Sequence, residues 1–79
     1  MEEEMKLKRA FNSGLGLEGQ IDYASLEFSK TAHWDSIAHM RLVAAIEEEF
    51  GIHLNINDIL GMSSYKVAQE IVQKYLSPS

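Results

Sequence analysis

The chain opens with an acidic turn followed by apolar residues at helical spacing. The glutamates at positions 2–4 suit the positive end of a helix dipole. After them, the apolar positions at three- and four-residue steps are Leu7, Ala10, Phe11 and Leu15. Gly14 and Gly16 predict the end of this first helix, because glycine tolerates the left-handed turn that closes helices.

Residues 36–50 predict a second helix. Asp35 is a good N-cap, no helix-breaking residue lies between Ser36 and Phe50, and Gly51 supplies a stop. The stripe that we expect to face the core consists of Leu42, Ile46 and Phe50, with Val43 at its edge.

A second apolar stripe lies roughly opposite on this helix and consists of Ile37, Met40 and Ala44. The charged residues interleaved with it are Arg41, Glu47 and Glu48. Because so small a domain cannot easily cover both sides of one helix, we expect one stripe to be exposed. An apolar strip edged by charge is typical of a surface that binds partners. A helix buried on all sides, or a homodimer face, is the alternative.

Two more helices are predicted towards the C-terminus. Capping residues at positions 55–58 precede Ile59, Leu60 and Met62, which predicts a short helix or a single turn. Ser63 or Ser64 then caps a last helix, which ends at Ser77-Pro78-Ser79. The apolar positions of that helix are Val67, Ala68, Ile71, Val72, Tyr75 and Leu76.

The segment from Leu17 to Trp34 keeps neither a helical nor a strand period. Its apolar residues, which indicate a loop packed into the core, are Ile21, Tyr23, Leu26, Phe28 and Trp34. The whole pattern predicts an all-α fold, namely a small antiparallel four-helix bundle of three main helices and one short helix. We expect one domain over residues 1–79, with its core at about 5–76.

Composition narrows the possible functions. A chain of 79 residues, of which 46% are hydrophobic, holds one core. The absence of cysteine excludes disulfides and thiolate metal sites, and three histidines make a weak zinc site. A net charge of −5 repels phosphate backbones and anionic lipid, which argues against a nucleic-acid partner and favours a positively charged one. The acidic N-terminus and the lack of a long apolar run predict a cytoplasmic protein without membrane insertion.

The candidate chemistry lies at the head of the second helix. Ser36 occupies the first helical position, where free backbone N–H groups and the helix dipole favour an attached anion, such as a phosphate ester. The alternative is that Asp35 or Ser36 only caps the helix. His39 lies three residues further on, but the helical wheel directs it towards the core and no third group orients it. We therefore do not expect an enzyme.

Three segments together resemble the acyl carrier protein family: Trp34-Asp35-Ser36-Ile37, Leu42-Val43, and Ile46-Glu47-Glu48-Glu49-Phe50-Gly51-Ile52. The resemblance covers the chain from about Leu7 to Leu76. It implies that Ser36 carries a 4′-phosphopantetheine arm from coenzyme A. It also implies that Asp35 and Ile37 assist recognition by a phosphopantetheinyl transferase, which requires Mg²⁺. The residues that the resemblance and the exposed stripe assign to partner docking are Met40, Arg41, Ala44, Glu47 and Glu48.

The resemblance further implies an acyl pocket, in which Ile59 and Met62 lie near the acyl chain. The core residues that could open to admit the chain are Leu42, Ile46, Ala68 and Ile71. Expected partners are an acyl-loading ligase or acyltransferase and a ketosynthase or other acyl-processing enzyme, with the carrier itself a monomer.

Two departures from the family pattern point to a specialised carrier. His33 stands where the family usually has glycine, and Ala38, His39 and Arg41 stand where carriers of primary fatty acid synthesis tend to be acidic. Arg41 would repel the basic patches of the usual partner enzymes. We therefore expect a secondary lipid, polyketide or polysaccharide-linked pathway. The alternatives are a peptidyl or aminoacyl carrier and an unmodified helical adaptor that binds through the Ile37, Met40 and Ala44 stripe.

Overall fold

The computed structural model describes residues 2–31 and 33–77. Its elements are α1 (Glu2–Leu15), the short 3-10 helix η1 (Tyr23–Ser25), α2 (Ser36–Phe50), α3 (Ile56–Gly61) and α4 (Tyr65–Leu76). The described part contains no strand and only one isolated bridge, between Glu27 and Ser64. The predicted all-α bundle of three main helices and one short helix is confirmed. Pro78 and Ser79, which were expected to follow the last helix, lie outside the described residues.

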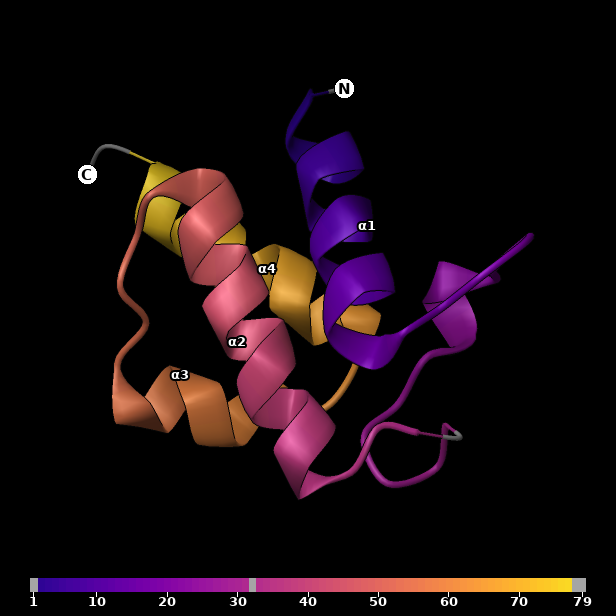
Figure 1. Cartoon of the computed structure of the whole chain (residues 1–79). Coiled ribbons are helices and arrows are strands. Elements are labelled where there is room, and N and C mark those ends of the chain that lie inside the picture. The colour runs from indigo at the N-terminus through magenta and orange to yellow at the C-terminus, as the bar shows by residue number, and fades with distance from the viewer. Residues whose placement is uncertain (1, 32, 78–79) are drawn as a thin grey trace.

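Helices α1 and α2 run antiparallel and side by side, α4 packs behind them, and α3 lies crosswise at the end of the bundle where α2 begins (Figure 1). The core fills the space between α1, α2, α4 and the long loop. Its largest fully buried side chains are Trp34, Phe11, Leu42, Ile46 and Met62. Trp34 comes from the loop and packs edge-on against Phe11 of α1, with ring centroids 5.5 Å apart.

The helix ends follow local signals. The Asn55 side chain caps α3 at the Asp58 N–H, and the Ser64 hydroxyl caps α4 at the Val67 N–H. Ser64 is therefore the cap of the last helix, and α3 begins three residues before Ile59. Gly51 ends α2 in the left-handed conformation, with φ of 64°.

The predicted end of α1 around Gly14 and Gly16 is confirmed. The helix continues through Leu15, and the left-handed residue that follows is Gly16, with φ of 67°. Gly14 is buried against α2, where an added Cβ would lie 2.6 Å from the Leu42 Cα. Its missing side chain lets the two helices approach closely.

The loop between α1 and α2 is packed, as predicted. Leu26 and Trp34 are buried, and Ile21, Tyr23 and Phe28 are half-buried against the core. Backbone hydrogen bonds also tie the loop to the start of α4, since the Phe28 N–H donates to the Ser63 carbonyl and the Tyr65 N–H donates to the Leu26 carbonyl. The loop thus delivers the chain to the head of α2 in a fixed position.

Candidate functional site

Ser36 is the first residue of α2, and its side chain is exposed. The preceding residue makes the cap, because an Asp35 carboxylate oxygen accepts the Ala38 N–H at 2.9 Å. The predicted capping role of Asp35 is therefore confirmed, and the Ser36 hydroxyl is not needed for it. A nucleophilic oxygen thus lies on the surface at the positive end of a 15-residue helix.

The backbone before this helix turns sharply. His33 has a φ of 72°, in the left-handed region, and its side chain is exposed. On either side of this turn, the Trp34 N–H donates to the Thr31 carbonyl and the Ser29 N–H donates to the Trp34 carbonyl. A glycine adopts this conformation without strain, whereas a residue with a Cβ does so at a cost. In this chain the residue with the left-handed backbone is a histidine, His33.

The outer side of α2 is the exposed stripe that the sequence predicted. We call Ile37, Met40, Arg41, Ala44 and Glu48 the α2 face; all five are exposed. Ile37 is 67% and Met40 57% exposed, so the alternative of a helix buried on all sides is wrong. Arg41 makes no ion pair within the described residues, whereas Arg9 pairs with Glu49 at 3.1 Å.

Glu47 has a different environment from the α2 face. Its side chain is half-buried, and Oε2 accepts the Leu54 N–H at 2.9 Å. This bond holds the turn that leads from α2 to α3. The docking role of Glu47 stays a prediction, since its carboxylate is engaged in a hydrogen bond within the protein.

An apolar groove of about 270 Å³ lies beside Ser36, between the start of α2 and α3. Its lining residues are Phe28, Ser36, His39, Met40, Ile56, Ile59, Leu60, Met62 and Ser63. Ile59 and Met62, which were predicted to lie near an acyl chain, both line this groove. Phe28, Ile56 and Leu60 were not predicted to do so. Ile56 and Leu60 are exposed apolar residues one helical turn apart on α3, a signal that the sequence already contained.

The other four predicted pocket residues lie elsewhere. Leu42, Ile46 and Ala68 are completely buried, and Ile71 is almost so. They pack the interior of the bundle and do not line the groove. An acyl chain could reach them only if the core opened, so their role stays a prediction.

His39 faces inwards, as the helical wheel predicted. It is buried, and both ring nitrogens are engaged: Trp34 Nε1 donates to Nδ1 at 3.0 Å, and Nε2 lies 2.7 Å from the Ile59 carbonyl oxygen. Since an indole N–H can only donate, Nδ1 must accept and Nε2 must carry the proton. Neither nitrogen is then available as a base for the Ser36 hydroxyl.

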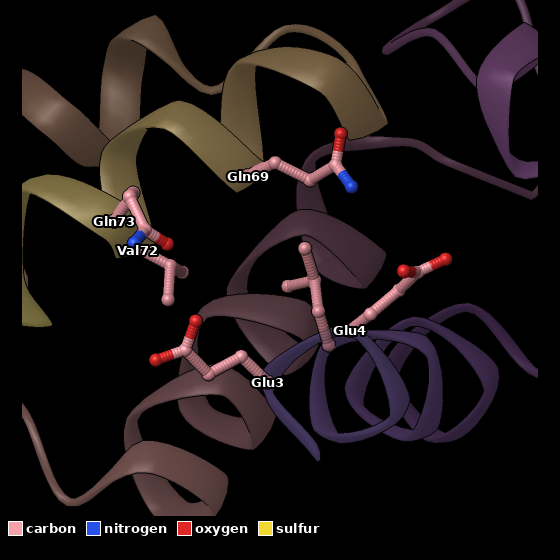
Figure 2. Close-up of a pocket in the computed structure, with 6 residues that line it drawn as sticks. Glu3, Glu4, Gln69, Val72 and Gln73 are labelled. Carbon is pink, nitrogen blue, oxygen red and sulfur yellow. The ribbon is translucent and has the colours of Figure 1, made fainter. Parts of the chain in front are cut away.

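A second hollow, of about 190 Å³, lies between the start of α1 and α4. Figure 2 shows Glu3 and Glu4 of α1 on one side of it and Gln69, Val72 and Gln73 of α4 on the other.

Within residues 2–31 and 33–77, no group of three or more His, Asp or Glu side chains could hold a metal ion. None of the helices in this part of the chain is long and apolar enough to cross a membrane.

Comparison with known families gives a match. The family model described as the phosphopantetheine attachment site matches residues 6–73, which is most of the chain. Members of this family carry a covalently attached 4′-phosphopantetheine group and act as carriers, in general without catalysis of their own. No curated protein and no solved structure matches the chain significantly. An exposed serine hydroxyl at a helix N-terminus, beside an apolar groove, fits such a group. The chain therefore belongs to the phosphopantetheine attachment-site family, as a carrier domain.

Proposed function

We propose that this chain is an acyl carrier protein and that Ser36 Oγ is the attachment point of its 4′-phosphopantetheine arm. The observation that carries the proposal is the division of tasks at the head of α2, where Asp35 caps the helix and leaves the Ser36 hydroxyl exposed. When bound, the arm supplies a terminal thiol that holds an acyl group as a thioester. The protein provides the attachment point and the surfaces around it.

The N-terminal end of α2 supplies the contacts for the transferase. Ser36 and Ile37 are both exposed there, and the Asp35 carboxylate is fixed by its cap bond to the Ala38 N–H. A transferase can therefore meet a rigid serine flanked by an apolar side chain and a carboxylate. Because the hydroxyl position is set by a helix end, little ordering is required on binding.

The α2 face supplies the contacts for the acyl-processing partners. Met40 lies between Ile37 and Ala44 on this face and also lines the groove, so a partner that covers α2 would border the cargo as well. Exposed apolar side chains contribute most of the docking energy when buried, and Glu48 adds electrostatic guidance towards a basic surface.

In this proposal the acyl chain binds first in the groove beside Ser36. It is lined mainly by apolar side chains and reaches Ser36 directly, so a chain attached there can cover its apolar surface without opening the core. Leu42, Ile46, Ala68 and Ile71 would be reached only by longer cargo, which would have to separate packed helices.

Arg41 favours a specialised pathway. It is exposed in the middle of the α2 face and has no ion-pair partner among the described residues. Arg41 repels a basic partner surface and attracts an acidic group.

Replacing Arg41 with Glu tests this explanation. Transfer of the acyl group to enzymes of fatty acid synthesis should improve, measured as a lower KM, with Lys66→Glu on α4 as a matched control. An unchanged KM for Arg41→Glu would remove this explanation.

The attachment itself is tested by intact mass. The protein is incubated with coenzyme A, Mg²⁺ and a broad-specificity phosphopantetheinyl transferase, alongside Ser36→Ala and the control Ser13→Ala, which alters an exposed serine of α1. We expect one added phosphopantetheine group in the parent and in Ser13→Ala, and none in Ser36→Ala. Circular dichroism establishes that all three are folded.

Two other functions give different results in this assay. No mass gain with several transferases would favour an unmodified helical adaptor that binds through Ile37, Met40 and Ala44. A peptidyl or aminoacyl carrier would gain the same mass, since it shares the fold and the arm. It would then be loaded by an aminoacyl-activating enzyme and not by an acyl ligase, which separates the two carriers.

A further inference from the structure

Helix α3 is attached to the bundle with little buried surface. It has six residues, from Ile56 to Gly61, and none of them is buried. Its largest apolar side chains, Ile56 and Leu60, are 63% and 75% exposed. Only Ile59 packs, half-buried, against the core. Hydrophobic burial within the helix therefore contributes little to fixing α3, although α3 forms one wall of the groove beside Ser36.

Hydrogen bonds from neighbouring helices hold α3 instead. Towards its start, the Asp58 carboxylate accepts from Tyr75 Oη and Lys74 Nζ of α4, both at 2.7 Å. In its second half, the Ile59 carbonyl accepts from His39 Nε2 of α2, also at 2.7 Å. The first attachment joins α3 to α4, and the second joins it to α2 across the groove.

The second attachment continues beyond α3. His39 Nδ1 accepts the indole N–H of Trp34, and the two rings are nearly parallel, at 21°. Trp34 is the only tryptophan of the chain and stands two residues before Ser36. One buried imidazole therefore links the loop that delivers Ser36 to the helix that faces it across the groove.

We propose that His39 is a positioning residue that couples the loop before Ser36 to α3 and so sets the width of the groove. The importance of that groove for a carried acyl group rests on the proposed function, but the coupling is a property of the unmodified protein. A displacement of α3 stretches the bond to His39 Nε2, and a shift of the imidazole alters the bond to Trp34. Entry of an apolar chain under α3 would thus alter the hydrogen bond to Trp34 in the loop beside the attachment serine.

Three substitutions separate the two bonds. The side-chain oxygen of Asn reaches the position of histidine Nδ1, so His39→Asn keeps the acceptor for Trp34 and loses the donor to Ile59. The side-chain nitrogen of Gln reaches the position of Nε2, so His39→Gln keeps the bond to Ile59 and loses the acceptor for Trp34. His39→Leu loses both bonds. His53→Gln, at an exposed loop histidine, is the matched control.

Hydrogen exchange is measured by NMR on the unmodified protein at two places. One is the indole N–H of Trp34, and the other is the set of backbone amides of α3. Loss of one hydrogen bond should accelerate exchange about tenfold at the group it protected. We therefore expect faster α3 exchange in His39→Asn, faster indole exchange in His39→Gln, and both in His39→Leu. Amides of α1 and the control variant should keep the parent rates.

The proposal is overturned if His39→Asn and His39→Gln give the same pattern, or if exchange accelerates equally in α1, because His39 would then support only global stability. Should His39→Leu not fold, the Asn and Gln variants decide, since each retains one bond.

A second measurement uses protein loaded from octanoyl coenzyme A by the transferase. Cleavage of the thioester by hydroxylamine should be severalfold faster in His39→Asn than in His39→Gln, because only the first loosens α3. Equal rates would refute the effect on the groove. Failure of every variant and the parent to load would refute the proposed function and leave the exchange rates to decide the role of His39.

Discussion

Replacing Gly14 with Ala tests the close packing of α1 on α2. The added Cβ would lie 2.6 Å from the Leu42 Cα and 2.9 Å from the Leu42 N, whereas ordinary contact begins at 3.4 Å. The neighbouring atoms belong to the backbone of α2 and cannot swing away as a side chain can. The two helices would have to separate by about 0.8 Å at this point, which is enough to weaken the dispersion contacts along their interface.

The expected loss is the difference between two effects. Overpacking a core typically costs about 1–3 kcal/mol, and a clash with backbone belongs at the upper end. Alanine is favoured over glycine inside a helix by about 1 kcal/mol. We therefore expect Gly14→Ala to lower the free energy of unfolding by about 2 kcal/mol. In a domain of this size such a loss corresponds to a decrease in Tm of roughly 8–16 °C.

Thermal and urea unfolding followed by circular dichroism measure this change. Gly61→Ala in α3 is the matched control, because an added Cβ meets nothing within 4 Å there. Its Tm should stay the same or rise slightly. If Gly14→Ala is as stable as Gly61→Ala, then α1 and α2 do not approach as closely as the structure has them and the reasoning fails.

Three other substitutions test local strain and ionisation. His33→Gly should raise the free energy of unfolding by about 0.5–1 kcal/mol, since glycine relieves the left-handed backbone; a lower Tm would contradict this. The hydrogen bond from Lys74 holds the pKa of Asp58 below its ordinary value of 3.8, so the ionised carboxylate stabilises the fold at neutral pH. Asp58→Asn should therefore lower the free energy of unfolding in urea at pH 7, and its difference from the parent should shrink below about pH 3.8. An equal loss of stability at pH 7 and below pH 3.8 would contradict this role of Asp58. Burial raises the pKa of Tyr65 to about 12, and its hydroxyl has no partner in the described part of the chain, so Tyr65→Phe should be at least as stable at pH 7. Its advantage should grow between about pH 10 and 12, where the unfolded phenol ionises first, and a constant difference in Tm over this range would refute the assignment.

The sequence alone predicts features whose cause is local. Asp35 and Gly51 bound α2 because an N-cap side chain and a left-handed glycine act within a few residues of themselves. The exposure of Ile37 and Met40 also follows from sequence, since one helix in a small domain cannot bury two faces. Ser36 could be selected because its position relative to the cap is fixed by the chain itself.

Features that depend on distant residues could not be predicted. A glycine that ends a helix and a glycine that admits a neighbouring helix look alike in sequence, so the close approach of Gly14 to α2 was not predicted. Glu47 bonds to a backbone N–H seven residues away, and His39 bonds to a carbonyl twenty residues away. Neither partner has a side-chain signature. The groove likewise combines the loop, α2 and α3, so its lining emerges only when the three are assembled.

The arrangement at Asp35 and Ser36 has a consequence for how this protein tolerates chemical change. The residue that caps α2 is Asp35, and the residue proposed for modification is its neighbour Ser36, so the cap bond does not require a free serine hydroxyl. The α2 face does not include the Ser36 side chain, so a copy with a free hydroxyl and a copy with a substituent there carry the same five α2 face residues. An enzyme that must tell the two copies apart therefore has to sense the substituent itself, while an enzyme that reads only the α2 face binds both and is open to competition from the unmodified form.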